Sequence, residues 1–137
     1  MEERMKKIRR DFVKAHKIYL RDMKWLREKF GIIPEVKDFT LKKAFSSSLD
    51  FLLENTPESF EESLKAFKEF HRKIIYDVAW DLLERTKKNL KLLQDTDPKL
   101  FEEKRKLWIQ ASWALSEAGY KNNFYRYYDC IDIVSRI

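Results

Sequence analysis

The stretch that decides the fold is residues 56–98, TPESFEESLKAFKEFHRKIIYDVAWDLLERTKKNLKLLQDTDP. Its apolar residues recur at three- and four-residue steps, which places them on one side of an α-helix. They are Phe60, Leu64, Phe67, His71, Ile74, Val78 and Leu82, and the pattern continues to Leu90 and Leu93. The spacing predicts a long helical segment over residues 57–95, either as one helix or as two joined by a bend.

Both ends of this segment carry helix-start signals. Thr56 precedes Pro57, and Asp97 precedes Pro98. In each pair the side-chain oxygen can cap free backbone N–H groups, and proline takes a position that needs no N–H donor. We therefore expect one helix to begin near residue 57 and another near residue 98, the second ending at Gly119.

The same periodicity extends to the rest of the chain. Residues 1–30 contain a stripe made of Met5, Ile8, Phe12, His16, Tyr19, Met23, Leu26 and Phe30. Residues 31–39 read as a loop because they contain Gly31 and Pro34. Further helices are expected from residue 40 to 55 and over the last residues of the chain. Since we expect short connections between them, the predicted fold is all-α, a bundle of four or five mostly antiparallel helices.

The composition supports a single helical domain over residues 1–137. The sequence holds only two glycines and three prolines, too few for the turns of a β-rich domain. Hydrophobic residues make up 44% of the chain, enough for one core. Charged residues make up 38%, which is typical of proteins from hot environments and suggests a thermophilic source.

The sequence also suggests a compartment. Cys130 is the only cysteine and cannot form an internal disulfide, and the charged amino-terminal region lacks the apolar stretch of a secretion signal. No run of about 18 apolar residues could span a membrane. We therefore expect a cytoplasmic protein with no membrane partner.

Catalytic and metal-binding patterns are missing from the sequence. No Cys/His cluster has zinc spacing, no glycine-rich loop could hold phosphate, and no serine lies in a nucleophile elbow. The acidic pairs Glu61/Glu62 and Glu102/Glu103 are adjacent in sequence, so their side chains diverge by about 100° on a helix and are expected to be solvated. The sequence therefore predicts no enzyme activity, no cofactor and no metal.

One catalytic alternative rests on Arg9 or Arg10 followed by His16. This spacing resembles the arginine–histidine motif of HEPN ribonucleases, which are all-α domains of similar size. The resemblance implies a ribonuclease site at these residues, although Asp11 follows Arg10 where that family has asparagine. The other interpretation is that His16, like His71, belongs to an apolar stripe and lies at the edge of the core.

The charge is concentrated in one segment. Residues 1–30 hold eleven Lys/Arg against five Asp/Glu, whereas residues 31–137 hold eighteen of each, so the net charge of +6 belongs to the first helix. Five of these cations follow three- and four-residue steps opposite the apolar stripe, namely Arg10, Lys14, Lys17, Arg21 and Lys24. We call these five residues the basic face. It is either a nucleic-acid-binding surface or a solvated helix face.

A second candidate lies near the carboxyl end of the sequence. Tyr120, Lys121, Tyr125 and Arg126 surround a predicted turn between two helices. Exposed tyrosine next to arginine can stack on unpaired bases, and the same residue types are favoured in protein interfaces. We call these four residues the turn patch, and both interpretations stay open for it.

Together these features predict a non-enzymatic, basic, all-helical subunit of a nucleoprotein assembly that contacts the nucleic-acid backbone. In gross type the chain resembles the small subunits of CRISPR effector complexes and the coat proteins of filamentous archaeal viruses. The expected partners are nucleic acid and other protein subunits or further copies of the chain. The alternative is a protein-interaction adaptor that has no nucleic-acid role.

Overall fold

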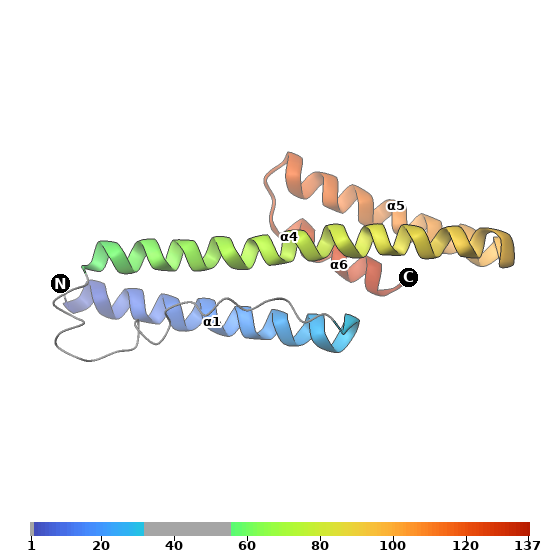
Figure 1. Cartoon of the computed structure of the whole chain (residues 1–137). Coiled ribbons are helices and arrows are strands. Elements are labelled where there is room, and N and C mark those ends of the chain that lie inside the picture. Colours follow the sequence, from blue (N-terminus) through green and yellow to red (C-terminus); the bar gives the residue numbers. More distant parts are fainter. Residues whose placement is uncertain (1, 32–55) are drawn as a thin grey trace. The chain divides into compact units, whose positions relative to one another are not determined.

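The computed structural model describes residues 2–31 and 56–137, and this part of the chain is all-α (Figure 1). Its helices are α1 (Glu2–Phe30), α4 (Pro57–Thr96), α5 (Pro98–Tyr120) and α6 (Tyr125–Ser135), with no strand among the described residues. The predicted all-α bundle is confirmed, and its helix count lies within the expected range. The helix expected over residues 40–55 and the loop after Gly31 lie outside the described residues.

Helix α4 is a single helix of 40 residues, which settles the choice between one helix and two. Thr56 caps its start: its hydroxyl oxygen accepts a hydrogen bond from the Ser59 backbone N–H at 3.2 Å. The predicted stripe from Phe60 to Leu82 is buried throughout. The chain divides into two compact units within α4, Met1–His71 and Arg72–Ile137, and each is described separately below.

In the first unit, α1 packs along the beginning of α4, and both helices run in the same direction (Figure 1). Arg4 lies near the start of α1 and bonds Glu58 at 2.8 Å, while Asp22, further along, bonds His71 at 2.8 Å. The expectation of antiparallel neighbours rested on short connections. It does not apply to this pair, because residues 31–56 separate the two helices in the sequence.

In the second unit, α5 runs antiparallel to the remainder of α4, and α6 runs antiparallel to α5, as expected for short connections (Figure 1). Asp97 caps α5 by accepting a hydrogen bond from the Leu100 backbone N–H at 3.1 Å. The Trp108 indole N–H donates to the Leu83 carbonyl at 3.0 Å and ties α5 to α4. The Lys104 ammonium donates to the Arg136 carbonyl at 3.2 Å, joining the start of α5 to the end of α6.

The predicted end of α5 at Gly119 is wrong. The helix continues through Tyr120, and the residue that takes the left-handed backbone conformation after it is Asn122, with φ +51°. Asparagine tolerates this conformation better than most non-glycine residues. Gly31 at the end of α1 behaves as expected: its φ is +65°, and its N–H donates to the Arg27 carbonyl at 2.9 Å.

Candidate nucleic-acid interface

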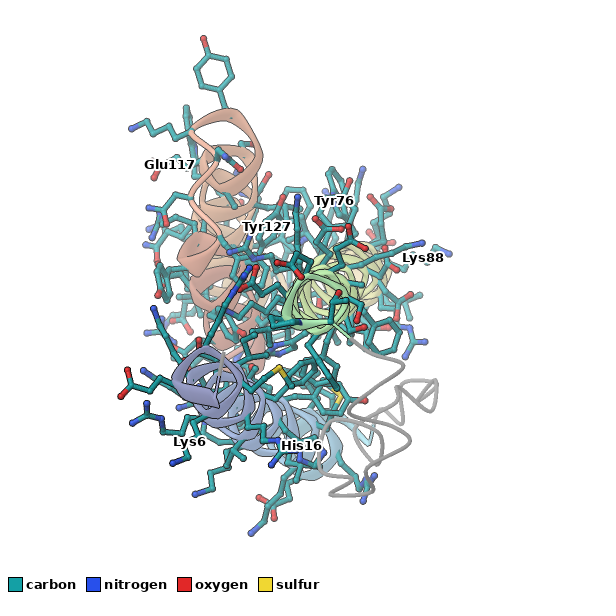
Figure 2. The ribbon with its side chains drawn as sticks, turned by 90° about the vertical axis from the view of Figure 1, so that its left-hand side faces the viewer. Lys6, His16, Tyr76, Lys88, Glu117 and Tyr127 are labelled. Atoms are coloured by element: carbon teal, nitrogen blue, oxygen red, sulfur yellow. The ribbon has the colours of Figure 1, made fainter. Side chains whose placement is uncertain are left out.

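The basic face is exposed along its whole length. Arg10, Lys14, Lys17, Arg21 and Lys24 are all solvent-exposed, on the side of α1 opposite the buried stripe. At 1.5 Å per residue, the row from Arg10 to Lys24 is about 21 Å long. Lys6, which was not among the predicted residues, is also exposed and precedes Arg10 by four residues, so it extends the row by about 6 Å (Figure 2).

Three members of the basic face have no carboxylate partner in the described part of the chain. Arg10, Lys14 and Lys17 make no ion pair with any residue in the described ranges. Lys24 lies 3.9 Å from Glu28, and Arg21 lies 3.4 Å from the buried carboxylate of Asp22. The central stretch of the face, from Arg10 to Lys17, is therefore the most strongly cationic part.

The turn patch, in the second unit, is less cationic than its sequence suggests. Tyr120, Lys121 and Tyr125 are exposed. The Arg126 guanidinium, however, contacts Asp129 at 2.8 Å and Glu117 at 3.1 Å. These carboxylates, Asp129 first, raise the pKa of Arg126 and offset its charge. A phosphate would have to compete with two carboxylates for this side chain.

His16 lies at the edge of the core. Its ring is half-buried, with centroids 6.4 Å from Tyr19 and 6.3 Å from Phe67. Arg10 is exposed on the basic face, while Arg9 is half-buried. Within residues 2–31 and 56–137, no three His, Cys, Asp or Glu side chains gather in the way a metal site requires.

The first unit contains a buried polar pair that was not predicted from the sequence. The His71 Nε2 and Asp22 Oδ2 atoms are 2.8 Å apart, and the two residues are only 8% and 3% exposed. The Tyr19 ring packs against the His71 ring, with centroids 5.6 Å apart. A buried carboxylate needs a partner, so the pair identifies His71 as a structural residue. The feature of the sequence that indicates this pair is Asp22, which follows Tyr19 by three residues and lies at the border of the apolar stripe.

Cys130 is fully buried in α6, and burial raises the pKa of its thiol from 9.0 to about 12. Since the thiolate is the reactive form, we expect the folded protein to resist iodoacetamide at pH 8 and the denatured protein to react readily. Because the folded pKa is the higher one, the associated stability is complete below pH 9 and falls as the pH rises toward 12. If the native protein were alkylated as fast as the denatured protein, Cys130 would not be buried.

None of the described helices is long and apolar enough to cross a bilayer. Comparison with protein-family models, with curated proteins and with solved structures gives no match to this chain.

Proposed function

We propose that this protein is a non-enzymatic subunit of a nucleoprotein assembly, which binds the nucleic-acid backbone through the basic face of α1. The observation that carries the proposal is the central stretch of that face. Arg10, Lys14 and Lys17 are exposed, lie on one side of the helix and have no carboxylate partner among the described residues. When cations in such a row neutralise phosphates, the counterions condensed on the nucleic acid are released, and this release favours binding.

The dimensions suit a phosphate backbone. A row of about 21 Å corresponds to about six nucleotides of one strand of B-form DNA, at about 3.4 Å per nucleotide along the axis. Lysine and arginine are the usual phosphate contacts, and such contacts carry no sequence information directly. The proposed binding is therefore general and dominated by electrostatics.

The second candidate function is a protein-interaction adaptor, and one observation favours it. Trp113 is exposed on α5 and lines a shallow surface hollow of about 270 Å³. The other residues lining this hollow are Trp108, Ile109, Ser112 and Ser116. Exposed tryptophan is enriched in protein interfaces, and in this case the turn patch would contribute further contacts.

Salt dependence separates the two functions. We expect binding to a fluorescent 20-base-pair duplex, with log K falling linearly against log salt concentration and a slope of about −4.5 for five phosphate contacts. This slope corresponds to about 500-fold weaker binding at 200 mM than at 50 mM salt. A peptide nucleic acid of the same sequence, which has bases but no phosphates, is the matched control and should not bind. Absence of duplex binding near 50 mM salt would favour the adaptor.

A further inference from the structure

The second unit contains a cluster of aromatic rings contributed by two helices. We call Tyr76 and Trp80 of α4, together with Tyr127 of α6 and Phe124 just before it, the aromatic cluster. Its ring centroids are 6.3 Å apart for Tyr76 and Trp80, 5.4 Å for Tyr76 and Tyr127, and 5.7 Å for Tyr127 and Phe124. Figure 2 shows Tyr76 and Tyr127 side by side. Each ring of the cluster therefore packs against at least one other ring.

Two of these rings are open to solvent. Tyr76 is 43% exposed and Trp80 is 44% exposed, whereas Tyr127 and Phe124 are half-buried. Two large aromatic side chains that touch each other and remain exposed form a small apolar surface on which a flat ring can stack. A partner that covers aromatic faces would remove this surface from water.

Cations border the cluster. The Arg72 guanidinium carbon lies 5.5 Å from the centre of the Phe124 ring, and Lys73 is exposed on α4. Lys87 is also exposed on α4, and its ammonium lies 6.0 Å from the centre of the Trp108 ring of α5. At about 100° per residue, Lys73, Tyr76, Trp80 and Lys87 fall within a sector of about 60°. No acidic residue of the second unit's part of α4 falls inside that sector; Glu84 lies just beyond its border.

We propose that the aromatic cluster binds single-stranded nucleic acid, with unpaired bases stacking on Tyr76 and Trp80 and phosphates contacting Arg72, Lys73 and Lys87. This inference rests on the proposed function, since it assumes that the chain binds nucleic acid. Aromatic rings bordered by cations are the usual single-strand platform, because every base has a face that can stack. Bases in a duplex already stack on each other, so their faces are not available. Protein interfaces are also enriched in tyrosine, tryptophan and arginine, so the feature that favours nucleic acid is the lysine beside the rings, a residue type depleted in protein interfaces.

The test compares Tyr76→Ala and Trp80→Ala with the wild type, using a fluorescent 20-nucleotide oligothymidine and a 20-base-pair duplex. Each variant should weaken single-strand binding about 10-fold or more and change duplex binding less than about 2-fold. Trp80→Phe keeps a ring and should retain most of the affinity. The matched control is Leu92→Ala, since Leu92 is exposed and apolar on the same helix but lacks a ring. Circular dichroism checks that each variant is folded.

The outcomes separate this inference from the proposed function. If both alanine variants bind the single strand as the wild type does while the duplex still binds in a salt-dependent way, the aromatic cluster is not the site and the proposed function stands. If the variants weaken single-strand and duplex binding equally, the cluster does not select unpaired bases, and the inference fails. If the wild type binds neither probe, both proposals fail.

Discussion

Replacing Arg10, Lys14 and Lys17 together by glutamate is expected to weaken duplex binding by about 10²- to 10³-fold at about 0.1 M salt. The three side chains account for three of the five proposed phosphate contacts, and each phosphate contact contributes about −0.9 to the slope of log K against log salt. The slope should therefore change from about −4.5 to about −2. The fold should survive, because all three side chains are exposed and have no ion-pair partner among the described residues.

The control must separate the position of the charge from its amount. Each replacement of this kind lowers the net charge by two, so the triple variant is formally neutral against +6 for the wild type. The control variant replaces Lys65, Lys68 and Lys88 by glutamate. These three residues are exposed on α4, so the control has the same net charge and an unaltered α1. We expect this control to bind nearly as the wild type does. Equally weakened binding in both triple variants would mean that net charge, and not the basic face, governs binding.

The structure decides which residues to reverse. By sequence spacing alone, Arg21 belongs to the basic face as fully as Arg10 does. Its guanidinium lies 3.4 Å from the buried carboxylate of Asp22, however, so glutamate at position 21 would place two negative charges together at the core boundary. That variant would therefore not separate weaker binding from unfolding. Lys14 is the cleaner choice.

Helix positions and buried faces could be predicted because they depend on local rules. Thr56 and Asp97 each cap the helix that they were expected to start, since a side-chain oxygen needs only the next turn of its own backbone. The exposure of the basic face follows in the same way from the period of one helix. The end of α5 was misplaced because Asn122 adopts the left-handed conformation expected of Gly119.

The features that could not be predicted all join residues from different helices. The direction of α1 along α4 depends on how residues 31–56 connect them, which periodicity does not reveal. The pairing of Arg126 with Glu117 arises only once α5 and α6 form a hairpin. The aromatic cluster likewise combines separate segments, and within α4 alone Tyr76 and Trp80 read as ordinary positions beside the stripe.

The second large effect concerns stability. Replacing His71 by leucine is expected to lower the free energy of unfolding by about 2 kcal/mol, because the buried Asp22 carboxylate loses its 2.8 Å hydrogen bond and keeps the longer contact with Arg21 at 3.4 Å. Leucine has a similar volume, so the destabilisation reflects the polar interaction and not a cavity. Urea denaturation followed by circular dichroism measures the change.

A double-mutant cycle with Asp22→Asn tests the cause. Asparagine keeps the shape of aspartate and removes its charge, so His71→Leu no longer leaves a charged group behind in the core. The cost of His71→Leu should then fall by about 1–2 kcal/mol relative to its cost in the wild type. Equal costs in the two backgrounds would show that the two side chains are not coupled, and that His71 contributes through packing against the Tyr19 ring.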